Sequence, residues 1–404
     1  MKFGKTIWDD PVAHVRAVRP DGPVLYFAPA VLQATARRFL AGFPGLVTYA
    51  VKANPELAVL QNLAEAGIGA FDVASVAEVS HVRQYLPEAA LHFNNPVRAA
   101  DEVRAAARQG VRSWSVDALS ELGKLCRVLG EEAGPSGRPL SGHEVSVRFA
   151  IAAAGGTYDF SSKFGADAAE AAEILDAAGR AGAYPSLTFH PGTQCTEPAV
   201  WRRHIEAAAA ICRKAGVTPW RLNVGGGFPS RRLAGEEPAL DAIFAEIRRA
   251  AVDAFEGRPP ALVCEPGRAM VAEAFTLGVR VRAIRRGDVF INDGVYGGFS
   301  ELPLMGATDR VRALSPDGRP RRGELRPVTV FGPTCDSVDR LPGRLALPAD
   351  IAEGDYLLFS GLGAYSLATA TRFNGFGDFS VVTVAALDGP AGCGGGAGQA
   401  ERAR

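Results

Sequence analysis

The first candidate for chemistry in this chain is Lys52, which directly follows a strand-like run at residues 47–51. Four of the five residues in that run are Val, Thr or Tyr, which favour a buried β-strand, and Asn54-Pro55 then ends it with a turn. A lysine at the end of an apolar strand is partly desolvated, which lowers its pKa and makes the free amine available to form a Schiff base. The same side chain could instead extend from the strand end into solvent.

Three consecutive glycines, Gly225, Gly226 and Gly227, follow another strand-like run at residues 222–224. Because glycine has no Cβ, backbone N–H groups at such a strand end can approach an anion closely. A phosphate is the usual anion near the last strands of a barrel. The alternative is that these glycines form only a loop.

Glu265, Arg268 and His190 also follow strand-like runs. Arg268 suits a bidentate grip on phosphate, whereas Glu265 could face a cavity or simply pair with that arginine. His190 supplies a flat ring, although a lone histidine can also be an ordinary core residue. Together with Lys52 and the glycines, these residues describe a pocket for pyridoxal phosphate. There the lysine would form the imine, the carboxylate would keep the ring nitrogen protonated, and the imidazole would stack on the ring.

Strand-like and helix-like segments alternate between about residues 25 and 267. The strand-like runs lie at 47–52, 71–75, 91–94, 113–117, 144–150, 186–190, 221–225 and 261–265. Helical spacing is seen at 56–66, 99–109, 166–182 and 198–215. This alternation predicts an α/β fold, a (β/α)₈ barrel in preference to a doubly wound open sheet. Since barrel enzymes build their sites at the C-terminal ends of the strands, the polar residues that end these runs should converge on one mouth.

The pattern changes after Pro266. Strand-like runs with turn residues between them lie at 275–284, 288–292, 326–332, 355–359 and 379–386. We therefore predict a barrel over residues 26–267, an all-β domain formed by residues 1–25 and 268–387, and a disordered Gly/Ala-rich tail over residues 388–404.

Composition excludes several classes of function. The 44 basic and 44 acidic side chains cancel, so neither nucleic acid nor an acidic membrane surface is an expected partner. We expect a cytoplasmic protein, because no apolar run reaches the ~18 residues that span a bilayer and no signal peptide is present. The six cysteines form no CxxC pair and are expected to be free thiols. The six histidines have no paired ligand spacing, so no metal site is expected.

Ordered motifs over residues 49–376 resemble the fold-type III, pyridoxal-phosphate-dependent amino acid decarboxylases of the ornithine/lysine/diaminopimelate group. The matching stretches are YAVKANP (49–55), FDVASVAEV (71–79), FHPGTQC (189–195), NVGGGFPS (223–230), EPGR (265–268), NDGVYGGF (292–299), FGPTCDSVD (331–339) and GAYSLATATRFNGF (363–376). The resemblance implies a TIM-like barrel of the alanine-racemase type with a C-terminal all-β domain. It also implies pyridoxal 5'-phosphate as cofactor and a homodimer with shared active sites.

The resemblance implies a role for each matching residue. Lys52 would hold the cofactor through an imine, which Asp72 and Glu78 would support. Arg148 would contact the ring substituents, His190 would stack on the ring face, and Glu265 would pair with the ring nitrogen. The phosphate would be held by the glycine loop and by Thr193, Arg268 and Tyr365.

The substrate side of the site is implied in the same way. Cys335 would lie over the α-carbon, Asp336 would bind a distal amine, and Tyr296 would lie beside the substrate. Cys335 and Asp336 would reach the pocket of the neighbouring subunit. From the residues alone, this segment could equally be a Gly-Pro turn with one buried thiol.

Two departures bear on the substrate. The family's HVGSxC loop is HPGTQC here, and Thr193 keeps the hydroxyl. Eukaryotic ornithine enzymes bring a Tyr-Asp pair toward the distal amine, and an ungapped register places Leu304-Met305 there. Asp336 would then be the main carboxylate for that amine, unless Glu301 or Asp309 compensates.

The expected activity is decarboxylation of L-ornithine to putrescine. A lysine or other diamino acid decarboxylase would differ mainly in pocket depth, and one methylene is worth only ~1–3 kcal/mol. Diaminopimelate has a second amino acid head group, which calls for an arginine and a glutamate instead of a Cys-Asp pair. A racemase needs a base on each face of the α-carbon, whereas Cys335 suits protonation from one side. A non-catalytic regulator would not need Lys52, Asp72 or Glu265.

Overall fold

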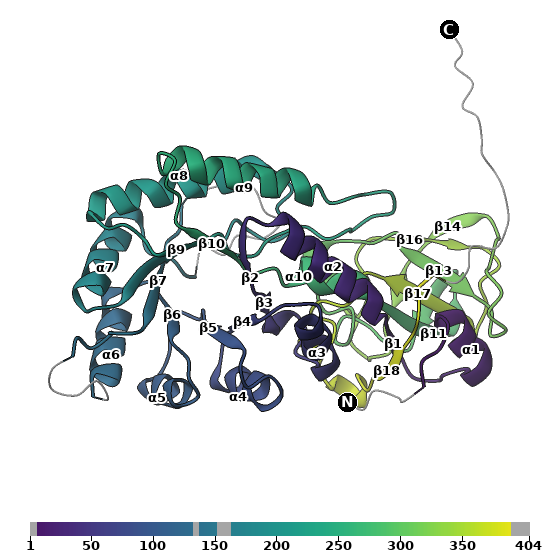
Figure 1. The fold of residues 1–404 in the computed structure, drawn as a ribbon. Coiled ribbons are helices and arrows are strands. Elements are labelled where there is room, and N and C mark those ends of the chain that lie inside the picture. The colour runs from purple at the N-terminus through teal and green to yellow at the C-terminus, as the bar shows by residue number, and fades with distance from the viewer. Residues whose placement is uncertain (1–5, 132–136, 152–162, 389–404) are drawn as a thin grey trace, which may run out of the picture.

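The computed structural model describes residues 6–131, 137–151 and 163–388. In Figure 1 a barrel of strands surrounded by helices lies beside a domain built mainly of strands. The predicted tail, from residue 389 onward, lies outside the described residues.

The barrel is a parallel sheet in the order β2-β10-β9-β8-β7-β6-β5-β4-β3. Its strands are β2 (Gly45–Val47), β3 (Tyr49–Ala50), β4 (Ala70–Val73), β5 (Ala90–Phe93), β6 (Ser113–Val116), β7 (Glu144–Arg148), β8 (Tyr184–Thr188), β9 (Arg221–Asn223) and β10 (Ala261–Cys264). β2 and β3 are two parts of one segment, separated by Thr48. The N–H and the hydroxyl of Thr48 both donate to the Cys264 carbonyl, at 2.9 and 3.0 Å. The sheet therefore closes on itself with eight strand positions, as predicted.

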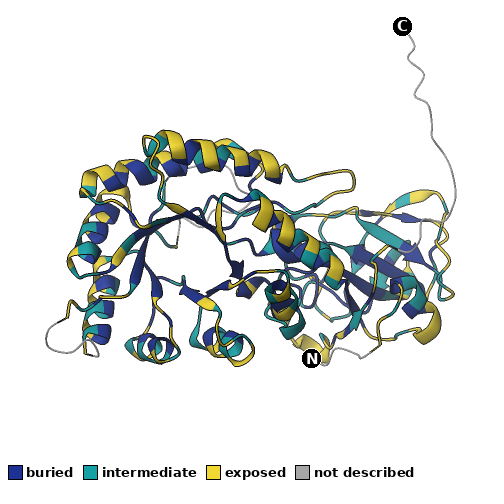
Figure 2. Cartoon of the chain, in the orientation of Figure 1, coloured by how far each residue is buried: buried dark blue, intermediate teal, exposed yellow. Residues whose placement is uncertain are grey.

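Amphipathic helices cover the outside of the barrel. They are α2 (Pro29–Gly42), α3 (Leu57–Glu65), α4 (Val76–Tyr85), α5 (Ala100–Arg108), α6 (Leu119–Gly130), α7 (Ala168–Arg180), α8 (Pro198–Ala215) and α9 (Leu240–Ala254). In α8, Trp201, Ile205 and Ala208 recur at helical spacing and are buried, whereas the opposite face is charged. Figure 2 shows this division along the helices, with exposed residues outward and buried strands within. None of the helices in the described ranges is long and apolar enough to cross a bilayer.

The second domain is built on a sheet in the order β13-β17-β11-β1-β18, with β12 and β15 attached through β11. The strands are β1 (Val24–Phe27), β11 (Phe275–Arg285), β12 (Asp288–Ile291), β13 (Val311–Leu314), β15 (Val330–Phe331), β17 (Tyr356–Ser360) and β18 (Ser380–Thr383), with a separate pair β14 (Leu325–Val328) and β16 (Leu345–Pro348). β1 lies between β11 and β18, so the N-terminal part of the chain is built into this sheet.

Short helices complete the domain: α1 (Pro11–Val18), α10 (Arg268–Val271), η2 (Ala272–Ala274), α11 (Leu302–Met305) and η3 (Phe373–Gly375). The predicted fold class, a barrel with an all-β domain, is confirmed. Strands β13 and β16 lie outside the runs that the sequence pattern marked. The run predicted at 326–332 is divided into β14 and β15, which pair with different strands. The five cysteines in the described part of the chain are free thiols.

Candidate active site

Lys52 lies at the centre of a 3₁₀ turn, η1 (Val51–Ala53), directly after β3. Its two neighbours in the turn are buried, whereas the Lys52 side chain keeps access to solvent. Burial lowers the pKa of the ammonium, but Tyr365, Asp72 and Glu265 act in the opposite direction and raise it above its ordinary value. The prediction of a lowered pKa is therefore wrong. Desolvation is the largest single influence on this pKa, but the influences of Tyr365, Asp72 and Glu265 together outweigh it.

Glu265 follows β10 and is the best-anchored carboxylate of the site. Its Oε1 accepts a hydrogen bond from Asn94 Nδ2 at 2.6 Å and another from Asn223 Nδ2. Burial and the charge of Asp72 raise the pKa of Glu265 to about 8, against the opposing effects of Asn223 and the nearby cations. A cation placed beside Glu265 would lower this pKa again, so the site is suited to a positively charged group.

Asp72 lies in β4 and is buried. Burial raises the pKa of Asp72, while Lys52, the Asn94 amide and Arg148 lower it. Arg148 ends β7, and its guanidinium lies 5.3 Å from the ring centroid of Phe164. Burial lowers the pKa of Arg148, and Glu265 is the largest opposing influence. At this mouth the two carboxylates therefore favour the charged forms of the two cations, and the cations favour the ionised forms of the carboxylates.

His190 follows β8, and its Nδ1 accepts the N–H of Gly192 at 3.1 Å. Burial, followed by Lys52 and Arg148, holds the pKa of His190 well below its ordinary value. The imidazole is therefore neutral, with its proton on Nε2. A neutral flat ring can cover an aromatic group without adding a charge to the two cations already present.

Residues 225–227, the glycine loop, form a backbone cradle with no room for a side chain at Gly225 or Gly227. Gly225 and Gly227 have φ of +71° and +76°, in the left-handed region that favours glycine. A Cβ at Gly225 would lie 2.2 Å from the Phe189 carbonyl oxygen, and one at Gly227 would lie 2.2 Å from that of Gly192. Only glycine fits, and the loop packs directly against the segment that carries His190. Such a cradle suits an anion such as phosphate.

Arg268 and Tyr365 bring the second domain to the same mouth. The Arg268 guanidinium lies 5.0 Å from the ring centroid of Tyr365 and forms an ion pair with Glu301. Tyr365 has φ of +64°, and its N–H donates to the Ala53 carbonyl at 2.7 Å, in the turn of Lys52. Thr193 is half-buried in the loop that packs on Gly227. The role of Arg268, Tyr365 and Thr193 in holding a phosphate stays a prediction.

Glu78 acts through the backbone. Its carboxylate accepts the N–H of Ala74 at 2.7 Å, and its own N–H donates to Ser75 Oγ at 3.2 Å. This arrangement caps the N-terminus of α4 and fixes the loop that follows Asp72.

Cys335, Asp336 and Tyr296 lie in the second domain. The Cys335 side chain is exposed, and its Sγ lies 3.2 Å from Asn374 Oδ1. Tyr296 donates its hydroxyl to Asp336 at 2.5 Å, and this hydrogen bond lowers the pKa of Asp336. Within the described ranges, the hydrogen bonds of Cys335 and Asp336 stay in the second domain. The role of these two residues at a neighbouring subunit's site stays a prediction.

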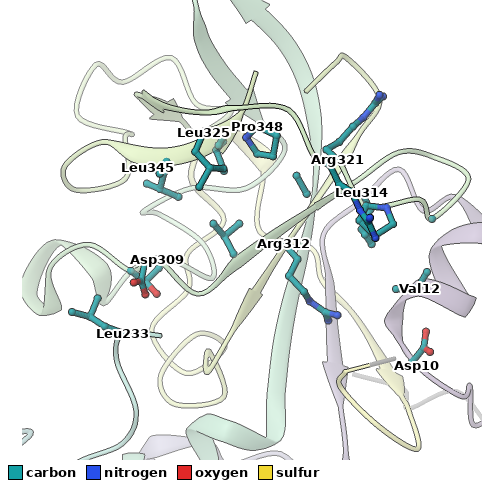
Figure 3. Close-up of a pocket in the computed structure, with 18 of the residues that line it drawn as sticks. Asp10, Val12, Leu233, Asp309, Arg312, Leu314, Arg321, Leu325, Leu345 and Pro348 are labelled. Carbon is teal, nitrogen blue, oxygen red and sulfur yellow. The ribbon is translucent and has the colours of Figure 1, made fainter. Parts of the chain in front are cut away.

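A cavity of about 1420 Å³ lies in the β domain between α1, β13 and the β14–β16 pair. Figure 3 shows Asp10, Arg312, Arg321 and Leu345 around it. Asp309, an alternative carboxylate for the distal amine, lines this cavity, whereas Lys52, Asp72 and Glu265 do not, so the cavity is separate from the cluster around Lys52.

Sequence reasoning assigned no role to Asn94 and Asn223, which contact Glu265. Asn94 ends the run at 91–94 and Asn223 lies within the run at 221–225, and the polar residues that end such runs are expected at the barrel mouth. Glu301, an alternative carboxylate for the distal amine, pairs with Arg268 instead. The described residues contain no group of three potential metal ligands.

Comparisons with known proteins agree with this geometry. The sequence model of a family described as pyridoxal-dependent decarboxylase, pyridoxal binding domain, matches residues 30–272. The chain is 31% identical to ornithine decarboxylase of Rattus norvegicus, over 84% of this chain and 75% of that protein. It is also 31% identical to antizyme inhibitor 2 of Xenopus laevis, over 84% of this chain and 76% of that protein.

Among solved structures, the chain is similar to the arginine decarboxylase of Paramecium bursaria Chlorella virus bound to agmatine. The TM-score is 0.80 and the sequence identity 25%, covering 91% of this chain and 98% of that one.

Proposed function

This chain belongs to the pyridoxal-dependent decarboxylases and acts on a basic amino acid, and we propose that its substrate is L-ornithine, with putrescine and carbon dioxide as products. The choice of substrate rests on which acidic side chains remain available to bind a distal ammonium. Glu301 is paired with Arg268, and Asp309 accepts the N–H of Ala234 at 2.7 Å. Asp336, whose pKa is lowered, remains ionised and accessible.

The residues present fit pyridoxal phosphate. Lys52 would hold it covalently, the cradle with Thr193, Arg268 and Tyr365 would hold its phosphate, and Glu265 would meet its ring nitrogen. Gly225 and Gly227 support this fit because a Cβ at either would collide with the 189–192 segment, so the backbone of the loop stays free of side chains at these two positions. When bound, pyridoxal phosphate supplies an electron sink for the electron pair that remains when a carboxylate leaves as carbon dioxide.

The protein's own groups set charge and protons around that chemistry. Neutral His190 would cover one face of the ring without opposing its positive charge. Glu265 would ionise beside a protonated ring nitrogen, which lowers its pKa from about 8. Cys335 would return a proton to the α-carbon from one side. Asp336 would bind the substrate's distal ammonium, and both residues would come from the partner subunit of a homodimer.

Apolar side chains at the two positions expected near the distal amine, Leu304 and Met305, support a substrate whose distal ammonium contacts a single carboxylate. Met305 is buried and Leu304 is 65% exposed. Met305 lines a small cavity of about 50 Å³ together with Arg268 and Glu301. An ornithine or lysine ammonium would then depend on Asp336 alone, and the two substrates would be separated by only ~1–3 kcal/mol.

One assay panel tests the proposal. Purified protein is supplied with pyridoxal phosphate and with L-ornithine, L-lysine, L-arginine or diaminopimelate, and released carbon dioxide is measured. We expect ornithine to give the highest kcat/KM and lysine to follow. A clear preference for arginine or diaminopimelate would contradict the proposed substrate.

A second candidate is a non-catalytic regulator, because one relative of equal identity is an antizyme inhibitor. Retention of Lys52, Asp72 and Glu265 supports the enzyme. Borohydride reduction of the protein with pyridoxal phosphate, followed by peptide mapping, should label Lys52. A protein that binds no cofactor and releases no carbon dioxide would be the regulator.

A further inference from the structure

Two amide side chains meet at one oxygen of Glu265. Asn94 reaches it from the end of β5, at 2.6 Å, and Asn223 reaches it from the end of β9. Within the described residues, every hydrogen bond to the Glu265 carboxyl group falls on this Oε1. The side chain is only half-buried, so the second oxygen is left for a group that enters the barrel mouth.

The orientation of the Asn223 amide is fixed by the backbone. Asn223 Oδ1 accepts the N–H of Gly225 at 2.9 Å, and a backbone N–H can only donate. The amide nitrogen must therefore face Glu265. This contact also joins Glu265 to the glycine loop, because the Glu265 N–H donates to the Gly225 carbonyl at 2.9 Å.

Asn94 lies between two carboxylates. Its amide nitrogen donates to Glu265, and the amide is close enough to Asp72 to lower the pKa of that carboxyl group. The two hydrogens of one amide nitrogen suit two acceptors that would otherwise repel each other. Both asparagines are thus neutral donors on a carboxylate that the charged groups Asp72, Lys52 and Arg148 surround. The neutral imidazole of His190 also lies at this mouth.

We propose that Asn94 and Asn223 are positioning residues that hold one oxygen of Glu265 and aim the other at the ring nitrogen of the bound cofactor. The inference rests on the proposed function, because it needs pyridoxal phosphate in this site. An amide does not titrate, so it holds Glu265 in the same way at every working pH. A carboxylic acid in its place would do so only while protonated.

Asn223→Asp is the sharpest test because it is nearly isosteric. The substituted side chain would still accept the Gly225 N–H, but it would present a second carboxyl oxygen to Glu265. At low pH one shared proton preserves the contact, whereas at high pH both groups cannot ionise side by side. We expect the affinity for pyridoxal phosphate to fall relative to the unsubstituted protein as pH rises.

The measurement is the dissociation constant of pyridoxal phosphate between about pH 6 and pH 9. The ratio of Asn223→Asp to unsubstituted protein should be within about threefold at the low end and exceed about tenfold at the high end, since one pKa unit corresponds to tenfold. Using a ratio cancels the titration of Asp72, Lys52 and His190, which both proteins share. Asn223→Ala should be weaker at every pH.

Asn95→Asp is the matched control. It adds the same charge one residue along the strand end from Asn94, but its amide donates to the Ala74 carbonyl at 3.4 Å and not to Glu265. For Asn95→Asp, the ratio of its dissociation constant for pyridoxal phosphate to that of the unsubstituted protein should not change with pH. A second arm uses an analogue with carbon in place of the ring nitrogen, for which the high-pH loss in Asn223→Asp should disappear.

The outcomes separate the two claims. A pH-dependent loss confined to Asn223→Asp and to the natural cofactor supports the inference. Flat ratios for Asn223→Asp, or equal losses with the analogue, would overturn it while leaving the proposed function intact. If the unsubstituted protein binds no pyridoxal phosphate, the proposed function fails first, and the inference falls with it.

Discussion

At the scale of single residues, Glu265 makes the folded protein sensitive to pH. Its folded-state pKa of about 8 lies above its ordinary value of 4.5, so the folded state binds a proton more tightly than the unfolded chain. The resulting stability is fully present below about pH 4.5 and is lost as pH rises through about 8. The cofactor-free protein should therefore become less stable across this window.

Glu265→Gln removes this titration. We expect the free energy of unfolding of the cofactor-free protein to change less between pH 5 and pH 8 in the variant, with the difference amounting to a few kcal/mol at most. Urea unfolding at the two pH values measures it, and Glu88→Gln, at an exposed position, is the control. Parallel pH slopes for the variant and the unsubstituted protein would show that Glu265 ionises normally.

Cys335 is the residue whose proposed role has the most specific product signature. Cys335→Ala should still release carbon dioxide from ornithine, because the thiol takes no part in breaking that bond. Without it, the α-carbon lacks its proton donor, and the proton would add to a carbon of the cofactor instead. Most of the product should then appear as an aldehyde, with the amino group left on the cofactor. Chromatography of the products tests this expectation, and putrescine alone would contradict the role of the thiol.

Single residues also mark where sequence reasoning was incomplete. Lys52, Glu265 and the glycines could be identified because each follows a strand-like run and has an evident chemistry. Asn94 and Asn223 could not, since their role comes from contact with Glu265, which lies 171 and 42 residues away. The direction of the Lys52 pKa shift was missed for the same reason, because it depends on Tyr365 of the second domain and on Asp72 and Glu265, which the fold brings near.

At the scale of the elements, the glycine loop after β9 carries the cofactor phosphate in our proposal. Gly227→Ala forces an alanine into φ of +76° and places its Cβ 2.2 Å from the Gly192 carbonyl oxygen. We expect a loss of stability greater than the ~1–2 kcal/mol that the left-handed backbone alone costs, and weaker binding of pyridoxal phosphate. Thermal unfolding and a cofactor titration would measure the two effects.

Gly235→Ala separates backbone strain from crowding. Gly235 has φ of +80° and no atom within 4 Å of its would-be Cβ. The control should lose only the backbone contribution and keep its affinity for the cofactor. Equal losses in both variants would show that the cradle tolerates a methyl group.

Element positions followed from the sequence where periodicity was strong. Barrel strands are buried runs between amphipathic helices, and the structure places them within a few residues of the predicted ranges. β13 was missed because an arginine interrupts its apolar run, and β16 because its short LALP run includes a proline. The division into β14 and β15 depends on pairing with β16 and β12, which no local pattern records.

At the scale of the whole molecule, the proposed proton donor and the proposed cofactor lysine belong to different domains. Lys52 lies at the barrel mouth, whereas exposed Cys335 bonds to Asn374 in the second domain. A homodimer with twofold symmetry would repeat any such contact twice, so each of two sites could combine Lys52 of one subunit with Cys335 of the other. In a mixed dimer of Lys52→Ala and Cys335→Ala subunits, one of the two sites would then combine an unsubstituted Lys52 with an unsubstituted Cys335.

Mixing Lys52→Ala with Cys335→Ala subunits tests this arrangement. Each variant alone should produce little putrescine. Random exchange makes half of the dimers mixed, and each mixed dimer has one intact site of two, so about a quarter of the native activity should return. Exchange must be verified independently, for example by native mass spectrometry of differently tagged subunits. If mixed dimers form and putrescine production stays at the level of the separate variants, each barrel works with the Cys335 of its own chain.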